Sequence, residues 1–196
     1  MASRKVNFVA GEYYHIYNRG AHKASIIREK ANYLFILGKI KTYIRKYDLT
    51  IIAYVLMPNH YHFLVRQNGE YRAGLLPQRV FNSYTKAYNK RYEHSGTLFE
   101  GPYEAIHVNT YNYLLHLCRY VHANPVKDGL VSGLEDWEFS NYAEFIGTRE
   151  GRLVDCEFVK DNFHSAQEYT DLVKDYLLKR DLPDDIKAYL TDWGAE

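Results

Sequence analysis

Cysteine and long hydrophobic runs are both scarce in this chain of 196 residues. Cys118 and Cys156 are its only cysteines, and they form neither a CxxC motif nor the dense, even set of a disulfide framework. No apolar stretch approaches the length that spans a membrane, and the opening residues "MASRKVNF" lack the long apolar segment of a secretory signal. The sequence therefore predicts a protein of the reducing cytoplasm with no membrane partner.

Net charge is also nearly absent, at +1, but the charges are unevenly distributed. Residues 155–196 carry 11 acidic and 5 basic side chains, whereas residues 1–154 carry 20 basic and 13 acidic ones. A basic body followed by an acidic tail indicates a polyanionic partner for the body. Tryptophan is rare at 2 residues while tyrosine reaches 20. We expect most of these tyrosines to pack at core edges, and a few to stack on bases or act as a nucleophile.

The spacing of apolar residues predicts an α+β domain. Apolar positions three and four apart predict helices, and β-rich or alternating runs predict strands. In chain order the predicted elements are a strand over 12–20, a helix over 33–47, strands over 49–57 and 60–67, a helix over 78–92, a strand over 96–108 and a helix over 110–124. This order is typical of a ferredoxin-like or RRM-like antiparallel sheet with helices on one face. The last helix is expected to stop before Pro125, because the residue before a proline disfavours helical geometry.

The chain is expected to divide into one domain over 1–150 and an acidic helical extension over 151–196 that packs on it. Apolar residues from Tyr169 to Leu177 predict an amphipathic helix in the extension, and "LPDDIKAYLTDW" predicts a further short one.

Two histidines one residue apart stand at the start of the predicted strand over 60–67. His60 and His62 follow the Pro-Asn link of a hairpin, and side chains two residues apart in a strand point to the same face. Two imidazoles on one face can chelate a single divalent ion. The alternative is an ordinary pair of strand residues, so a third ligand decides between the two interpretations.

The predicted helix over 110–124 offers that ligand. His116, Tyr120 and Asn124 are spaced four residues apart and share one helix face. If this face lies against the two histidines, the amide oxygen of Asn124 completes a two-histidine, one-oxygen site and the Tyr120 hydroxyl lies beside the ion. Such a site suits phosphodiester cleavage, with a tyrosine nucleophile and an ion that offsets charge on the phosphate oxygens. Alternatively, Asn124 only ends the helix and Tyr120 packs at the edge of the core.

The predicted helix over 78–92 has two different sides. An i, i+4 column of apolar and aromatic residues is expected to face the core; it consists of Val80, Tyr84, Tyr88 and Tyr92. Another side carries a basic stripe with Arg79, Lys86 and Lys90, which we interpret as a surface that tracks phosphates. The alternative is a stripe that is merely solvated.

Five segments occur in the order seen in REP-associated tyrosine transposases, and the chain resembles that family. They are "YHIYNRG", "AYVLMPNHYHFLV", "SYTKAYNKRYEHSGTLFEGPYEA", "RYVHANPVKDGL" and "DWEFSNY", which together extend over about residues 12 to 145. The family consists of single-tyrosine transposases of the His-hydrophobic-His nuclease superfamily. One departure is Pro102, which stands where the family commonly has a basic residue after "SGTLFEG".

The resemblance implies a role for each residue of the predicted site. His60 and His62 are metal ligands, Asn124 is the third ligand and Tyr120, in "RYVHANPV", is the nucleophile. The implied cofactor is Mg²⁺ or Mn²⁺, and the implied substrate is single-stranded DNA beside a hairpin or palindromic repeat. Cleavage leaves a 5′-phosphotyrosine and a free 3′-OH. The residues we assign to DNA binding are Arg19, Arg79, Lys86, Lys90 and Arg91.

The implied protein is prokaryotic in type and associated with the nucleoid in the cytoplasm. Its state as a monomer or homodimer, its DNA target sequence and a domesticated role in place of DNA mobilisation stay open. Because every predicted catalytic residue lies upstream, we expect strand cleavage not to require residues 155–196.

Three other functions have a lower standing. Replication initiators and relaxases place a lysine three residues after the tyrosine, where this chain has Ala123. Cyclic-phosphodiester hydrolases carry paired His-x-Thr/Ser motifs, which the sequence lacks. A domesticated nucleic-acid-binding module without catalysis would not need an intact set of His60, His62, Tyr120 and Asn124.

Overall fold

A four-stranded antiparallel sheet forms the centre of the computed structural model, which describes residues 6–178. Its strands are β1 (Tyr13–Arg19), β2 (Leu49–Leu56), β3 (His60–Gln67) and β4 (Glu104–Val108), arranged in the order β2-β3-β1-β4. The hairpin of β2 and β3 pairs Leu56 with Tyr61, and β1 lies between β3 and β4. This order, in which the first and third strands are the central pair, confirms the predicted ferredoxin-like sheet.

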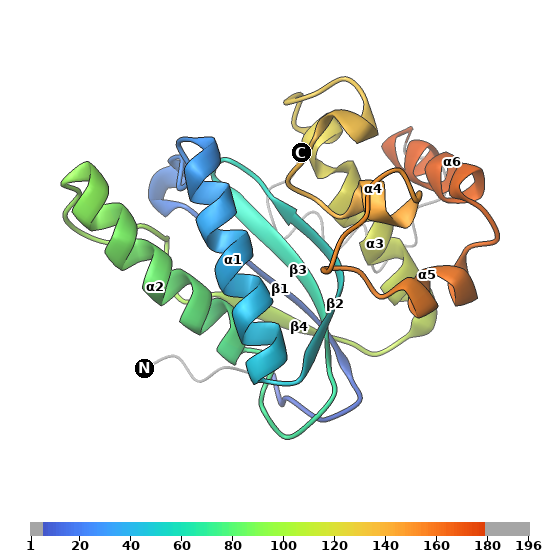
Figure 1. The fold of residues 1–196 in the computed structure, drawn as a ribbon, viewed down its shortest axis with the longest axis horizontal. Helices are drawn as coiled ribbons and strands as arrows, with labels where there is room; N and C mark the ends of the chain where they lie inside the picture. The colour runs from blue at the N-terminus through green and yellow to red at the C-terminus, as the bar shows by residue number, and fades with distance from the viewer. Residues whose placement is uncertain (1–5, 179–196) are drawn as a thin grey trace.

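In the described part of the chain, the helices are α1 (Lys30–Lys46), α2 (Leu75–Tyr92), α3 (Tyr111–Lys127), α4 (Tyr142–Phe145), α5 (Cys156–Asn162) and α6 (Ala166–Leu177), with two short 3-10 helices at Ala21–Lys23 and Leu134–Asp136. Helices α1 and α2 lie side by side over one face of the sheet (Figure 1). None of the helices within residues 6–178 is long and apolar enough to cross a membrane. The short helix expected in "LPDDIKAYLTDW" lies outside the described residues.

Burial of one stripe on each helix explains why α1 and α2 cover this face. Ile36 and Ile40 of α1 and Val80 of α2 are fully buried in one core with Ile16 and Phe63 of the sheet. Such regularly spaced apolar residues gain about 1.5–3 kcal/mol each when removed from water. The face therefore has a continuous apolar core.

The tyrosine column of α2 belongs to this core, as predicted. Tyr84 and Tyr88 are buried, and the Tyr84 hydroxyl donates a hydrogen bond of 2.6 Å to the carbonyl oxygen of Ile26. Tyr92 lies at the edge, where its hydroxyl donates to Glu29. These tyrosines pack rather than face solvent.

The other face of the sheet is covered by α3 together with the helices that follow it (Figure 1). Helix α3 begins at the N-cap Thr110, whose side chain accepts a hydrogen bond from the backbone N–H of Tyr113. Its residues Leu114 and Leu117 pack against Val55 of β2 in a second core. The predicted packing of helices on one face of the sheet is therefore seen for α1 and α2. Helix α3 forms a separate layer on the other face.

The end of α3 differs from the prediction, because the helix continues through Pro125 to Lys127. A proline in the last turn costs the helix one internal hydrogen bond. The end is closed by two bonds around Gly129, which has φ +69: its N–H donates to Val126 O, and the N–H of Leu130 donates to Pro125 O. This pair is the Schellman arrangement, which favours glycine after a helix. Gly129 therefore marks the end of the helix, and Pro125 does not.

The predicted strand over 96–108 is also shorter in the structure, which forms β4 only over Glu104–Val108. Gly96 has a positive φ of 99° and Pro102 has no N–H to donate to a ladder. Phe99 makes one isolated bridge to Gly20. The segment before β4 is therefore a loop along the end of β1.

Candidate active site

Strand β3 places the two histidines of the His-x-His motif on the face covered by α3. The intervening Tyr61, and Phe63 after His62, point to the opposite face and stack with Phe81 of α2. His60 is 8% exposed and His62 is fully buried, with ring centroids 5.1 Å apart. The shared face that the spacing predicted is therefore present.

Helix α3 brings Tyr120 and Asn124 to the same place. The Tyr120 hydroxyl lies 3.4 Å from Nε2 of His62, and their ring centroids are 5.1 Å apart. Asn124 donates from its side-chain nitrogen to the carbonyl oxygen of Tyr120, at 2.7 Å, and its amide also interacts with His60 and with the Tyr120 hydroxyl. All four residues predicted for the catalytic centre are thus together in the fold.

Hydrogen bonds on the far side of each ring set the orientation of the two histidines. Nδ1 of His60 lies 2.7 Å from Oδ1 of Asn59, whose side-chain nitrogen donates to Lys23 O, so Nδ1 carries the proton and Nε2 keeps its lone pair. Nδ1 of His62 lies 3.0 Å from Nε2 of His15. The Nε2 atom of His62 then faces the Tyr120 hydroxyl.

The donor set fits a divalent ion only if Asn124 takes part. Within residues 6–178 no group of three or more His, Cys, Asp or Glu side chains could hold a metal ion. Two imidazole nitrogens and one amide oxygen, with water and phosphate oxygens, make a set that Mg²⁺ or Mn²⁺ can accept. The residues that could hold such an ion are His60, His62 and Asn124.

Burial sets the protonation states at the centre. Loss of hydration lowers the pKa of His60, against the opposing effects of Asp128 and Asn124, and lowers the pKa of His62 well below its usual value. Both imidazoles are therefore neutral at pH 7, which is the form that binds metals. Burial likewise raises the pKa of the Tyr120 hydroxyl, and hydrogen bonding to Asn124 opposes that shift only in part. Tyr120 needs further stabilisation of its anion before it can act as a nucleophile.

Three residues near the centre were not predicted from the sequence. His15 is fully buried against His62, with ring centroids 5.1 Å apart. Lys127 lowers the pKa of His62, and Asp128 raises that of His60, so charges at the end of α3 act on the two histidines. His15 lies two residues from Tyr17, which pairs with His62, so His15 faces the same side of the sheet as the two histidines; only the assembled sheet defines this register. Lys127 was missed because the helix was expected to end at Asn124.

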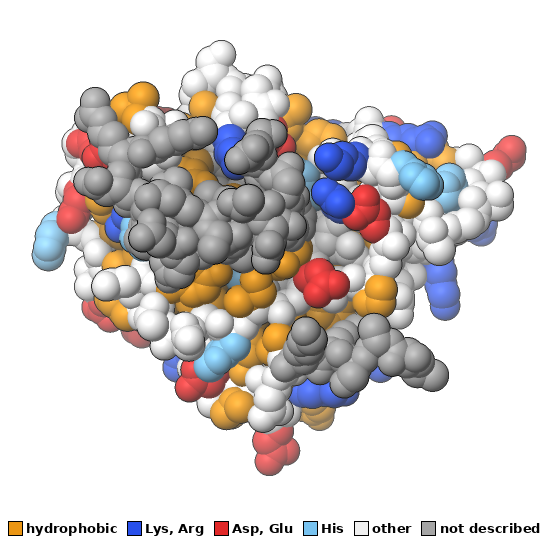
Figure 2. Space-filling view, turned by 180° about the vertical axis from the view of Figure 1, so that it is seen from behind, with side chains coloured by type: hydrophobic (Ala, Val, Ile, Leu, Met, Phe, Trp, Pro, Cys, Tyr) orange, Lys and Arg blue, Asp and Glu red, His pale blue; other side chains and the backbone are white. Residues whose placement is uncertain are grey.

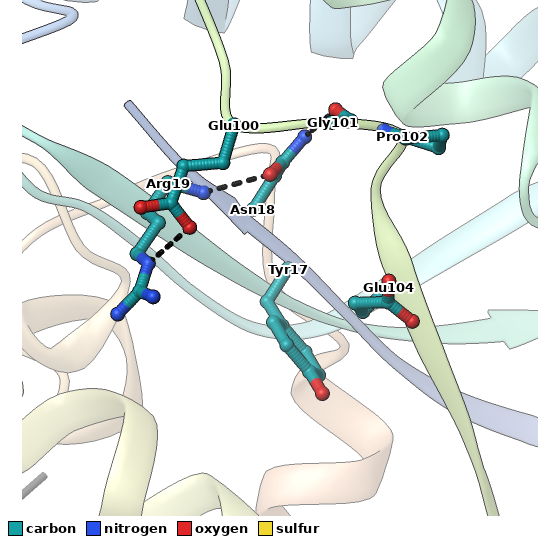
Figure 3. Close-up of a pocket in the computed structure, with 7 residues that line it drawn as sticks. All are labelled: Tyr17, Asn18, Arg19, Glu100, Gly101, Pro102 and Glu104. Atoms are coloured by element: carbon teal, nitrogen blue, oxygen red, sulfur yellow. Dashed lines mark hydrogen bonds and ion pairs between the residues drawn. The ribbon is translucent and has the colours of Figure 1, made fainter. Parts of the chain in front are cut away.

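A cavity of about 270 Å³ opens at the end of β1 (Figure 3). Its lining residues are Tyr17, Asn18, Arg19, Glu100, Gly101, Pro102 and Glu104. Tyr17 pairs with His62 and Arg19 pairs with His60 across the sheet, so both side chains lie on the face of the histidines. Arg19 forms an ion pair of 2.5 Å with Glu100. Of the predicted DNA-binding residues, Arg19 is therefore the one beside the candidate site.

The remaining predicted DNA-binding residues are not brought to the centre. Arg79, Lys86 and Lys90 are exposed on α2, which covers the opposite face of the sheet. Arg91 forms an ion pair of 2.7 Å with Glu29. On the face drawn in Figure 2, Lys and Arg side chains stand in separate groups with Asp and Glu between them. The role of the α2 stripe in DNA binding stays a prediction.

The C-terminal helices hold α3 through a buried polar network. The ring of His122, on the side of α3 away from Tyr120, lies between the Tyr169 hydroxyl, 2.5 Å from Nδ1, and Oδ1 of Asn141, 2.9 Å from Nε2. Asn141 belongs to the motif "DWEFSNY" and also donates to the carbonyl oxygens of Ile52 and Leu153. That motif therefore has a structural role.

Helix α6 also reaches the predicted nucleophile, since the ring centroids of Tyr176 and Tyr120 are 6.3 Å apart. Tyr176 contributes to the raised pKa of Tyr120. Helix α6 therefore packs beside the predicted nucleophile, and the independence of strand cleavage from residues 155–196 stays a prediction.

Comparison with known proteins gives one family match and several structural matches. The profile of the family described as "Transposase IS200 like" matches residues 8–124. Curated proteins offer no match. Among solved structures, a REP-associated tyrosine transposase bound to a REP hairpin superposes with a TM-score of 0.64 at 17% identity, covering 79% of this chain and 94% of that one.

Two further structures are less similar. A putative transposase from Deinococcus radiodurans has a TM-score of 0.42 at 11% identity, covering 61% of this chain and 95% of that one. A tRNA(His) guanylyltransferase from Saccharomyces cerevisiae has 0.46 at 10%, covering 90% and 82%. Neither carries an argument at that level. The family profile and the first structure confirm the resemblance that the motifs predicted.

Proposed function

Because this chain belongs to the IS200-like transposase family, we propose that it is a metal-dependent single-strand DNA endonuclease and strand transferase. The single observation that carries the proposal is the position of the Tyr120 hydroxyl, 3.4 Å from Nε2 of His62, with Asn124 beside both Tyr120 and His60. A nucleophile, two neutral imidazoles and an amide oxygen are the parts that phosphodiester cleavage through a covalent tyrosine intermediate needs.

His60, His62 and Asn124 would hold Mg²⁺ or Mn²⁺. The protein would act in the cytoplasm. The ion, when bound, polarises the scissile phosphate and offsets the charge that develops on its oxygens. Asn59 and His15 keep the two histidine rings turned with Nε2 toward the centre. Lys127 adds positive charge near His62, where the phosphate would enter.

Tyr120 would attack the phosphorus once its hydroxyl has lost its proton. The new bond joins the tyrosine oxygen to phosphorus, and the bond from phosphorus to the 3′-oxygen of the preceding nucleotide breaks. The 3′-oxygen takes up a proton and becomes a free 3′-OH, while the 5′-phosphate stays on Tyr120. Attack by a second 3′-OH on this phosphotyrosine rejoins the strands, which is the transfer step of transposition.

The substrate we propose is single-stranded DNA next to a hairpin or palindromic repeat. The solved structure with the same fold has a REP hairpin bound, which supports a hairpin partner for this chain. The cavity lined by Tyr17 and Arg19 lies next to the histidines and would receive the nucleotide beside the scissile phosphate. Arg79, Lys86 and Lys90 would contact backbone further from the cut.

End-labelled DNA tests this function. The protein is incubated with Mn²⁺ and single-stranded DNA from the flanks of its gene, and adducts that survive denaturation are separated on a gel. We expect a labelled protein with 3′-end-labelled DNA and none with 5′-end-labelled DNA, because the 5′-phosphate is the group retained. His60→Ala is the matched control without adduct. Absence of an adduct on every strand tested, or retention of the 5′-labelled fragment, would contradict the proposal.

A further inference from the structure

His15 is a fully buried polar residue on β1, and its ring contacts a predicted metal ligand from behind. Its Nε2 atom lies 3.0 Å from Nδ1 of His62, and the two rings meet edge to edge, with centroids 5.1 Å apart and planes 25° from parallel. The rings of Tyr17 and Tyr120 hold His15 from two further sides, with centroids 5.0 and 6.0 Å away. The contact is therefore made by a ring that has little room to turn.

The hydrogen bond between the two rings contains one proton, and its position decides what His62 offers to the centre. A neutral imidazole carries one N–H and one lone pair. If Nδ1 of His62 carries the proton and donates it to Nε2 of His15, then Nε2 of His62 keeps its lone pair. If His15 donates instead, Nε2 of His62 carries the proton and cannot bind an ion.

We propose that His15 is a positioning residue that accepts the Nδ1 proton of His62 and thereby fixes His62 in the tautomer whose Nε2 atom binds the divalent ion. Asn59 does the same for His60, since its Oδ1 accepts from Nδ1 of that ring at 2.7 Å. The two ligands thus have matching partners, one from the preceding residue and one from the neighbouring strand. Partners of this kind orient metal-binding histidines and raise their affinity for the ion.

The proposal rests on the proposed metal-dependent cleavage, but its first test needs no metal. Two-bond ¹H–¹⁵N correlation spectra of the metal-free protein, with His62→Gln to assign the peaks, report which nitrogen of His62 carries the proton. We expect the proton on Nδ1 in the wild type, and a mixture with protonated Nε2 in His15→Leu. A wild-type His62 protonated on Nε2, or a His15→Leu spectrum with the proton still wholly on Nδ1, would overturn the proposal.

Titration with Mn²⁺ gives the second test. His15→Leu should bind Mn²⁺ about 10–100-fold more weakly than the wild type, which is the usual effect of removing a residue that hydrogen-bonds a metal ligand. His15→Gln, whose side-chain oxygen can accept the same proton, should recover most of this affinity. His122→Gln is the matched control, because it alters another buried histidine of the same layer with no contact to His62. We expect it to lower stability and leave Mn²⁺ affinity unchanged.

The outcomes separate this proposal from the proposed function. Unchanged Mn²⁺ affinity in folded His15→Leu, with tight binding by the wild type, would overturn the role of His15 and leave the cleavage mechanism intact. A wild type that binds no Mn²⁺ would overturn the mechanism, while the tautomer spectra still decide whether His15 fixes His62.

Discussion

Removal of the Tyr169 hydroxyl should loosen the attachment of α6 to α3, which carries the proposed nucleophile. The amide nitrogen of Asn141 donates to two backbone carbonyls, so its Oδ1 must accept the hydrogen bond from Nε2–H of His122. The other ring nitrogen of His122, Nδ1, then accepts the hydrogen bond of 2.5 Å from the Tyr169 hydroxyl. Both residues are almost wholly buried. In Tyr169→Phe, Nδ1 of His122 is a buried acceptor without a donor.

The expected loss follows from the cost of such an unpaired group, about 1–3 kcal/mol of the free energy of unfolding. For a domain of this size, about 1 kcal/mol corresponds to a shift of about 2–4 °C in Tm. Tyr142→Phe is a matched control, because its hydroxyl bonds the partly exposed Thr170 side chain, which is also bonded to Ala166 O. That change leaves no buried acceptor unpaired and should cost at most about 1 kcal/mol.

Urea unfolding followed by circular dichroism measures both losses. Formation of the DNA adduct at 20 °C gives a second readout, and Tyr169→Phe should retain it because His122 points away from Tyr120 on α3. Equal stability of Tyr169→Phe and Tyr142→Phe would refute the proposed direction of the hydrogen bonds. Loss of the adduct in a folded Tyr169→Phe would show that α6 does more than support α3.

Three further results are expected. Replacing Arg79, Lys86 and Lys90 by glutamine should weaken binding of all DNA sequences alike. The slope of log affinity against log salt concentration should become shallower by about 0.7 for each lost phosphate contact. Unchanged DNA affinity at low salt would show that the stripe is merely solvated. Burial lowers the pKa of His122 to about 4, below its value of about 6.5 in the unfolded chain. The free energy of unfolding that His122 contributes is therefore fully present above pH ~6.5. It falls as the pH drops toward ~4, because the unfolded state then binds a proton that the folded state does not. His122→Gln should reduce the slope of stability against pH by up to about 1.4 kcal/mol per unit, which urea unfolding at several pH values measures. Chelation with EDTA should stop adduct formation by the wild type, and added Mn²⁺ should restore it. His60→Ala should form no adduct even after Mn²⁺ is added. An adduct formed by the wild type in EDTA would contradict metal dependence.

The spacing of residues was sufficient to predict which four side chains the fold brings together at the candidate site. His60 and His62 share a face because strands alternate, and Tyr120 and Asn124 share a face because helices repeat about every four residues. The helical spacing of α2 likewise predicted that Tyr84 faces the core. Such local periodicities survive in the fold because burial of one face supports each of them.

Contacts between distant segments could not be read from the sequence. His15 meets His62 across 47 positions of chain, through a strand register that only the assembled sheet defines. The sequence also did not indicate on which face of the sheet α3 lies. Because α3 and α2 cover opposite faces, the sheet separates Tyr120 from Lys86. The end of α3 was misjudged because the preference of residues before proline was outweighed by burial of Asn124 and by the Gly129 turn.

The identity of the nucleophile is the central claim, and mapping of the covalent adduct tests it most directly. The protein is reacted with single-stranded DNA and Mn²⁺, digested with protease and nuclease, and the peptide that carries the nucleotide is identified by mass spectrometry. The account predicts the nucleotide on Tyr120, no adduct from Tyr120→Phe, which loses one hydroxyl and little volume, and a retained adduct from Tyr176→Phe, its ring neighbour on α6. A nucleotide on any other tyrosine, or full adduct formation by Tyr120→Phe, would contradict it.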